Sequence, residues 1–151
     1  MVDDLPSDEA QAIIALIKFG EPGEWDWSPE LWGTANCAFG VTDRDGKRIQ
    51  GVTADLLVKY GQRPPSSHFL FTIYKQEFKA RRRVYQLDLL QNGRKKVDPH
   101  RVSHEHIGRD RIPGEAAWQQ YRYEDALQLF CTRTNLTLSG ELPDPYVLQL
   151  L

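Results

Sequence analysis

Three of the four histidines in this chain lie within one ten-residue segment, residues 99–108. Side chains of an extended strand alternate between its two faces, so His100, His104 and His106 would all lie on the same side. Imidazole titrates near neutral pH and can take up or release a proton during a reaction. The spacing therefore predicts a histidine-centred site, with His100, His104 and His106 as candidate catalytic residues.

Arginines surround this segment in the sequence and are the candidate substrate-binding residues. A guanidinium is always charged and binds phosphate through several N–H donors. One imidazole could remove a proton from a ribose 2′-hydroxyl while a second group protonates the leaving oxygen, a reaction that needs no metal. The pattern thus favours acid–base chemistry on RNA. The candidate arginines are Arg81, Arg83, Arg101, Arg109 and Arg111.

The same residues are also compatible with a metal site or with an ordinary polar strand. The His-x-His pair, with His100 nearby and Asp98 or Glu105 in reach, could bind zinc or manganese. Because no fourth ligand follows at a diagnostic spacing, we predict no metal and no other cofactor. In a polar strand without chemistry, the histidines would pair with Asp98, Glu105 or Asp110.

Charge is divided unevenly along the 151 residues, although the net charge is only −2. Residues 79–111 contain ten bases and four acids, whereas residues 1–32 contain eight acids and one base. The basic segment could bind RNA or pair with the acidic one. The acidic segment also contains Trp25, Trp27 and Trp32, which we interpret as a connector covering the core rather than a base-stacking platform.

The pattern near the N-terminus predicts a helix over residues 7–20. Ser7 would be its N-cap, acidic residues would occupy its first turn, and Gly20 would end it. A second helix is expected near the C-terminus, where Tyr123, Ala126 and Phe130 recur at helical spacing, with Leu127 beside them.

Between the two helices the pattern changes to that of strands. Two strands from residue 34 onward are predicted to join at the turn 43–46, and two more cover residues 66–78 and 81–91, the last ending at an Asn92-Gly93 turn. In the last strand Val84, Gln86, Asp88 and Leu90 would face one way. His68, at the start of a strand, is interpreted as structural.

The chain is therefore predicted to be a single α+β domain over residues 1–151. Its parts are an N-terminal helix, a mostly antiparallel sheet of four to six strands, and a C-terminal helix packed on one face. Cys37 and Cys131 are expected to be unpaired core residues. No apolar run approaches the roughly 20 residues that span a bilayer, and the first residues are acidic, so we expect a cytoplasmic protein with no membrane partner.

The order of these segments resembles that of a group of small prokaryotic proteins. VYQLDLLQNG, then DPHRVSHEHIG, then WQQYRYEDALQLFCTRTNL is similar to an R-x-D-L strand followed by a His-x-His segment, an aromatic stretch and a final helix. The group includes the TumE-like proteins of toxin–antitoxin loci. The resemblance covers roughly residues 67–136. This chain lacks the turn that precedes the histidines in that group.

Two functions from different classes follow. The first is a small prokaryotic or phage-borne protein of the toxin–antitoxin or defence type that acts on RNA through the histidine site, with an antitoxin as its protein partner. The alternative is a noncatalytic interaction module, an adaptor or inhibitor, that binds a protein through its acidic, Trp-rich N-terminal segment.

Overall fold

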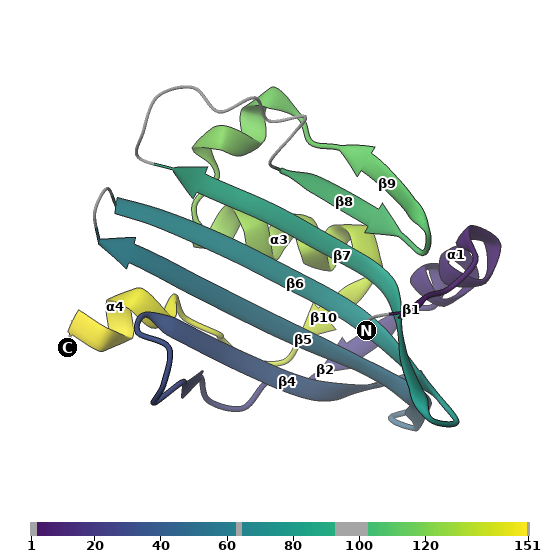
Figure 1. Cartoon of the computed structure of the whole chain (residues 1–151). Helices are drawn as coiled ribbons and strands as arrows, with labels where there is room; N and C mark the ends of the chain where they lie inside the picture. The colour runs from purple at the N-terminus through teal and green to yellow at the C-terminus, as the bar shows by residue number, and fades with distance from the viewer. Residues whose placement is uncertain (1–2, 63–64, 93–102, 151) are drawn as a thin grey trace.

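The structure is a computed structural model, and it describes residues 3–62, 65–92 and 103–150. These residues form one large sheet with helices on one side of it (Figure 1). The helices are α1 (Ser7–Ala15), a 3-10 helix (Ala116–Gln120), α3 (Tyr123–Thr134) and α4 (Pro145–Leu150). The strands are β1 (Asp3–Asp4), β2 (Lys18–Gly20), β3 (Asp26–Trp27), β4 (Thr34–Thr42), β5 (Arg48–Gln62), β6 (Pro65–Glu77), β7 (Ala80–Asn92), β8 (His104–Ile107), β9 (Asp110–Pro113) and β10 (Leu136–Leu138).

The centre of the sheet is an antiparallel meander of long strands. Its order is β10-β2-β4-β5-β6-β7-β8-β9, and β1 and β3 pair with β7 and β4 outside this path. The α+β class, the largely antiparallel sheet and the C-terminal helix on one face are confirmed. The predicted number of four to six strands is wrong, because the described residues form ten. The additional strands have only two to four residues, too few for an alternating pattern to reveal them.

The hydrophobic core lies between the long strands and α3. Alternate residues of β5, β6 and β7 point toward α3, and the aromatic side chains of Phe71 and Phe130 meet edge to face with their centroids 5.8 Å apart. Tyr123 contacts Trp25 in the same way, at 6.0 Å. Burial of such aromatic side chains is among the largest stabilising contributions in a domain of this size. The predicted helical face, with Tyr123, Ala126 and Phe130 buried, is confirmed.

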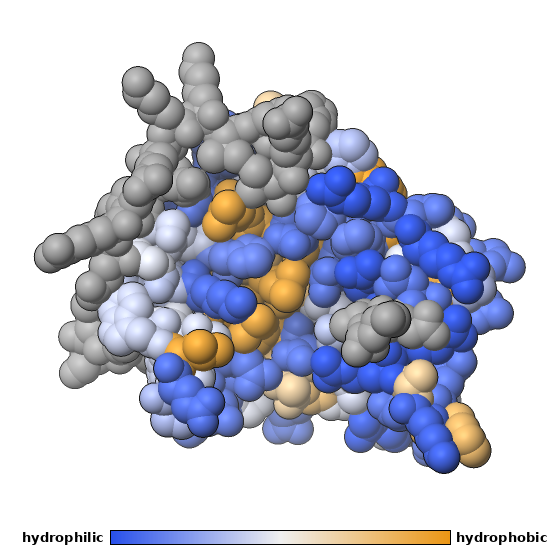
Figure 2. Space-filling model, in the orientation of Figure 1, coloured by the Kyte–Doolittle hydropathy of each residue, from blue (hydrophilic) through white to orange (hydrophobic). Residues whose placement is uncertain are grey.

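The opposite surface of the sheet, called the open face here, is crossed by no helix of the described residues (Figure 1). It consists of the alternate residues that point away from α3. Figure 2 shows it as mostly hydrophilic, with an apolar strip through its middle. Leu57 and Leu70 are cross-strand partners on this face, and both are partly exposed.

Three local expectations are corrected by the structure. The first helix ends at Ala15, because Leu16 is extended and Lys18–Gly20 forms the short strand β2. Ser7 is the first helical residue, and Pro6 occupies the N-cap position without a side-chain hydrogen bond. Val84 belongs to the core rather than to the side of Gln86, because a register shift between Ile73 and Tyr74 leaves Val84 without a cross-strand partner.

The remaining local expectations have simple outcomes. The turn joining β4 and β5 at residues 43–46 is confirmed, with Gly46 at a φ of 77°. The predicted turn at Asn92-Gly93 includes Gly93, which lies outside the described residues. Both cysteines are free, Cys37 being buried and Cys131 partly buried. No helix among the described residues is long and apolar enough to cross a membrane.

Lys18 joins the two main helices to the edge of the sheet. Its side chain is fully buried, and its Nζ donates hydrogen bonds to the carbonyl oxygens of Ile14 (3.0 Å), Leu16 (2.7 Å) and Thr134 (2.7 Å). Burial lowers the pKa of Lys18 to about 8, so the ammonium group keeps its charge at neutral pH. One cation therefore satisfies carbonyl groups at the C-terminal ends of both α1 and α3.

Replacement of Lys18 should strongly destabilise the fold. In Lys18→Met three carbonyl oxygens lose the ammonium group that donates to them, the one of Thr134 at a buried hydrogen bond, and we expect the free energy of unfolding in urea to fall by about 3 kcal/mol. Lys47→Met, at an exposed lysine of the β4–β5 turn, is the matched control and should change it by less than about 0.5 kcal/mol. Equal stabilities of the two variants would contradict the role given to Lys18.

Candidate functional site

His104 and His106 lie on the open face of β8, as the two-residue spacing predicts. Their rings are in contact, with centroids 4.8 Å apart and an angle of 84° between the ring planes. Both side chains are partly exposed. His104 is the cross-strand partner of Asp88, and His106 is the partner of Gln86. His100 and Arg101 lie outside the described residues.

Glu105, between the two histidines, points to the other side of the sheet and is buried there. It accepts hydrogen bonds from the Tyr85 hydroxyl (2.8 Å) and from Arg133 Nε of α3 (3.2 Å). Burial and the adjacent carboxylate raise the pKa of Tyr85, so its hydroxyl stays protonated and donates. A slip of one residue would move Glu105 to the open face and both histidines into the core. Glu105 therefore determines which way the histidines point, and its proposed role as a metal ligand beside them is wrong.

Asp88 and Arg111 hold His104 from its two sides. The Arg111 guanidinium donates to Nδ1 of His104 at 3.3 Å, so Nδ1 accepts and the ring proton resides on Nε2. This Nε2 faces the Asp88 carboxylate at 3.6 Å. The side chain of His104 is only 13% exposed. Its orientation and its tautomer are thus both determined by neighbours.

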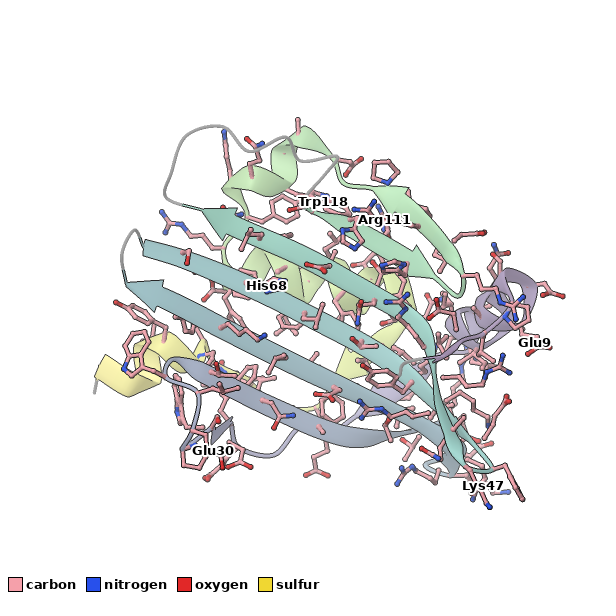
Figure 3. The ribbon with its side chains drawn as sticks, viewed as in Figure 1. Glu9, Glu30, Lys47, His68, Arg111 and Trp118 are labelled. Carbon is pink, nitrogen blue, oxygen red and sulfur yellow. The ribbon has the colours of Figure 1, made fainter. Side chains whose placement is uncertain are left out.

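His68 belongs to the same row of side chains, although the sequence offered no partner for it. Its Nε2 lies 2.7 Å from Oδ1 of Asp88, so one carboxylate connects His68 on β6 with His104 on β8. Figure 3 labels His68 on β6. The sequence placed Gln86 and Asp88 on one face of their strand, which is correct. The sequence could not show that His68 and His104 lie on either side of Asp88. The register between two strands depends on how they pair, and the residues of one strand alone do not reveal it.

His106 has few partners in comparison with His104. Its Nδ1 is buried and has no hydrogen-bond partner in the described part of the chain. Burial, followed by electrostatic interactions with Arg83 and His104, lowers the pKa of His106 to about 4. Asp4 opposes this change and Arg111 adds to it. The imidazole is therefore neutral at pH 7 and lies in a region of positive potential.

The candidate arginines occupy different positions relative to the histidines. Arg83 donates to Gln86 (2.9 Å) and pairs with Asp4 (2.9 Å) beside His106, while Arg111 is the cross-strand partner of His106 on β9. Arg81 lies farther along β7, where it is 3.7 Å from Asp55. Arg109 is exposed in the turn between β8 and β9. The structure thus brings Arg83 and Arg111 to the histidines, and leaves Arg81 and Arg109 at the edges.

Among the described residues, no three His, Cys, Asp or Glu side chains are arranged to hold a metal ion. His100 and Asp98, which the metal hypothesis also invoked, lie outside these residues.

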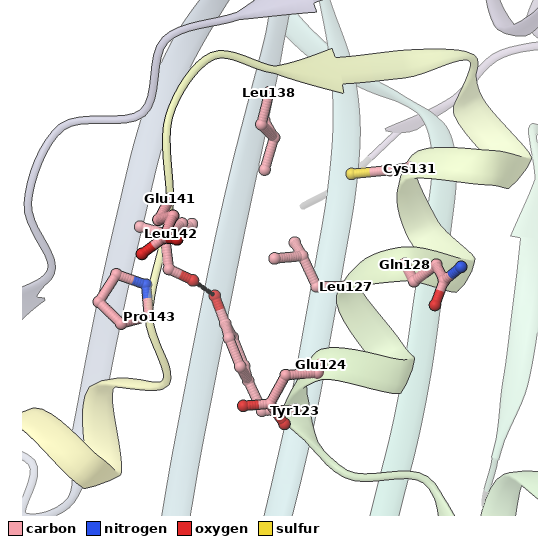
Figure 4. A pocket seen from close by; sticks show the side chains of 9 residues that line it. All are labelled: Tyr123, Glu124, Leu127, Gln128, Cys131, Leu138, Glu141, Leu142 and Pro143. Carbon is pink, nitrogen blue, oxygen red and sulfur yellow. Dashed lines mark hydrogen bonds between the residues drawn. The ribbon is translucent and has the colours of Figure 1, made fainter.

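Two hollows lie on the opposite side of the sheet from the histidines. One, of about 390 Å³, lies between α3 and the segment that follows β10, and its lining includes Leu127, Cys131 and Leu138 (Figure 4). The Tyr123 hydroxyl at its edge donates to the carbonyl oxygen of Leu142 (2.7 Å). Burial raises the pKa of the Cys131 thiol to about 11, which disfavours the nucleophilic thiolate. The lining also includes the carboxylates of Glu124 and Glu141, but no imidazole or guanidinium is among its described lining residues.

The larger hollow, of about 840 Å³, lies at the far end of β5 and β6. Its lining includes Tyr60, Tyr121 and Tyr146. Asp144 in this hollow accepts a hydrogen bond from the Tyr60 hydroxyl. The histidine cluster on the open face, here defined as His68, Asp88, His104, His106, Arg83 and Arg111, therefore remains the best candidate for chemistry.

The lowered pKa of His106 has a measurable consequence for stability. Between pH 6.5 and about pH 4 the unfolded chain binds a proton at this position that the folded chain excludes, so the folded state loses stability as the pH falls. We expect His106→Asn to reduce the loss of unfolding free energy between pH 7 and pH 5 by about 1 to 2 kcal/mol. Urea unfolding at pH 5, 7 and 8 measures this change. A parallel pH dependence in the two proteins would contradict the buried, neutral state of His106.

Comparison of the chain with protein families, with curated proteins and with solved structures found no match in any of the three.

Proposed function

We propose that this protein acts on RNA through the histidine cluster, as a small ribonuclease of the toxin–antitoxin or defence type. The observation that best supports the proposal is the contact between two imidazoles on an open face, with one arginine on each side of His106. Positive potential at this place favours a bound anion, and the phosphate of an RNA backbone is an anion that also presents the 2′-hydroxyl needed for cleavage.

His106 is the proposed general base. A phosphate beside Arg83 and Arg111 offsets their positive charge and moves the pKa of His106 up from about 4 toward neutrality, where general-base catalysis works best. The imidazole then takes the proton of the 2′-hydroxyl, and the 2′-oxygen forms a bond to phosphorus. The two guanidinium groups stabilise the negative charge that develops on the phosphate oxygens.

His104 is the proposed general acid. Arg111 donates to Nδ1 of His104 in the free protein, and the movement of its exposed guanidinium onto the phosphate makes this nitrogen available. In the protonated ring Asp88 accepts from Nε2, and Nδ1 gives its proton to the 5′-oxygen as the P–O bond breaks. The products are a 2′,3′-cyclic phosphate and a free 5′-hydroxyl, so no water or metal takes part in this step.

Cleavage assays on a short single-stranded RNA test these roles. His106→Ala and His104→Ala should each lower the cleavage rate by about 100-fold or more, because each removes one partner of the proton transfer. An RNA with a 2′-deoxy group at the scissile position should resist the wild-type protein. EDTA should leave the rate unchanged, and loss of activity that zinc or manganese restores would instead indicate a metal mechanism.

The control for this experiment is Trp32→Ala, which lies in the acidic segment away from the histidines and should cleave normally. Circular dichroism establishes that each variant is folded. RNA that stays intact with folded wild-type protein, together with normal growth of cells that express it, would exclude a ribonuclease.

The interaction module is the second candidate, and the exposure of Leu31 and Trp32 favours it. Both side chains are 59% exposed, whereas Trp25 is buried and Trp27 is partly buried on the core. The predicted connector is thus confirmed for two of the three indoles. Exposed Glu30 precedes Leu31 directly, so a partner with an apolar pocket and a basic rim would fit this surface (Figure 3).

A further inference from the structure

The residue at the tip of the β6–β7 hairpin is a phenylalanine whose backbone conformation and exposure are both unfavourable. Phe78 has a φ of 51°, a region that non-glycine residues rarely adopt, and its side chain is 95% exposed. A glycine or asparagine would suit this turn better, and burial would suit the ring better. Neither the fold nor the core explains why phenylalanine occupies this position.

Positive charge surrounds this tip. The turn between β4 and β5 lies at the same end of the sheet (Figure 1). Lys75, three residues before Phe78, donates from Nζ to the Gln50 carbonyl of β5 at 2.6 Å. Residues 43–48 and 75–82 together contain seven Lys and Arg residues and three Asp and Glu residues. Lys79 Nζ lies 5.8 Å from the centroid of the Phe78 ring.

A line of arginines on the open face connects the tip with the histidine cluster. Arg81 and Arg83 are the cross-strand partners of Gln76 and Tyr74, and the Arg81 guanidinium is stacked 3.8 Å above the Tyr74 ring. Stacking keeps this guanidinium extended along the face, where half of the Arg81 side chain is exposed. Arg83 then leads to Gln86, the partner of His106.

The length of this line suits a short single strand of nucleic acid. Phe78 and Gln86 are eight residues apart along the hairpin, which corresponds to about 26 Å of extended strand. Proteins that bind single strands combine a cationic path for the phosphates with aromatic rings on which bases stack. Here the aromatic ring of Phe78 and the cationic path of Arg81 and Arg83 lie along one line that leads to His106.

We propose that Phe78 is a base-stacking anchor for single-stranded RNA, which then runs along the open face of β7 to the histidine cluster. The proposal rests on the function proposed above and adds a substrate subsite to it. Lys79 and Arg81 bind the phosphates on either side of the stacked base. An exposed aromatic ring among lysines could also insert into an anionic membrane. The ordered line of arginines toward the histidines favours a linear polyanion.

Binding to a fluorescein-labelled, fully 2′-O-methylated RNA of ten nucleotides tests the anchor without cleavage. We expect Phe78→Ala to weaken the Kd measured by fluorescence anisotropy about tenfold or more, and Phe78→Trp to preserve it, because both rings can stack on a base. Trp32→Ala is the matched control, since it removes another exposed aromatic ring on a surface that is acidic, and it should leave the Kd unchanged.

Phe78→Gly separates the anchor from the stability of the fold. Glycine relieves the backbone strain, so its Tm should rise by a few degrees while RNA binding weakens as in Phe78→Ala. Unchanged RNA affinity in both variants would overturn the anchor. If the wild-type protein still cleaves RNA in that case, the proposed function survives alone, and if the wild type neither binds nor cleaves RNA, both proposals fall.

Insertion of Phe78 into an anionic membrane is the competing outcome, and lipid vesicles test it. Wild type and Phe78→Ala are sedimented with vesicles of phosphatidylcholine and phosphatidylserine in a 3:1 ratio, a composition chosen for its anionic surface. Equal recovery of the two proteins in the supernatant is the expected result. Sedimentation that depends on Phe78, with an RNA affinity that does not, would assign the tip to an anionic membrane surface and overturn the RNA anchor.

Discussion

The buried ammonium group of Lys18 is the constraint on which the arrangement of the layers depends. A charge in the interior is destabilising unless its hydrogen bonds are satisfied, and here three carbonyl oxygens satisfy it. Two of these oxygens come from the end of α1 and one from the end of α3, two helices more than a hundred residues apart in the chain. Lys18 can therefore be buried only when both helices end at the same corner of the sheet, where β2 and β10 pair in parallel.

The position of α3 in turn determines what the open face presents. Arg133 on the last turn of α3 reaches Glu105, and Tyr85 donates to the same carboxylate from β7. Two elements, α3 and β7, thus fix the register of the short strand β8 through one buried side chain. A strand of four residues has too little apolar area to fix its own register, so the polar contact on the core side holds the two histidines on the other side.

The sequence predicted those features that depend on local patterns. The helix around Tyr123 and Phe130, the turn at residues 43–46 and the common face of His104 and His106 were all accessible from spacing alone. The end of α1 was not, because the partners of Lys18 and of β2 come from the far end of the chain. The role of His68 was missed for a similar reason, since Asp88 becomes its neighbour only when β6 and β7 pair. The bulge that turns Val84 inward also has no signal in the strand itself.

The uneven charge along the chain has two different outcomes in the fold. Part of the charge of the basic segment is offset by the acidic N-terminus, because β1 pairs in parallel with β7 and Asp4 forms an ion pair with Arg83 at 2.9 Å. This ion pair offsets only part of the positive charge, because Arg83 still lowers the pKa of His106 beside it. The excess that remains lies at the hairpin tip and along the open face, where a strained, exposed Phe78 and an unpartnered nitrogen of His106 are also found. In most of the molecule, apolar side chains are buried and buried polar atoms have hydrogen-bond partners. The exposed Phe78 and the buried Nδ1 of His106 depart from these rules, and both lie along one line of the open face. Such departures are expected at residues that serve binding rather than stability.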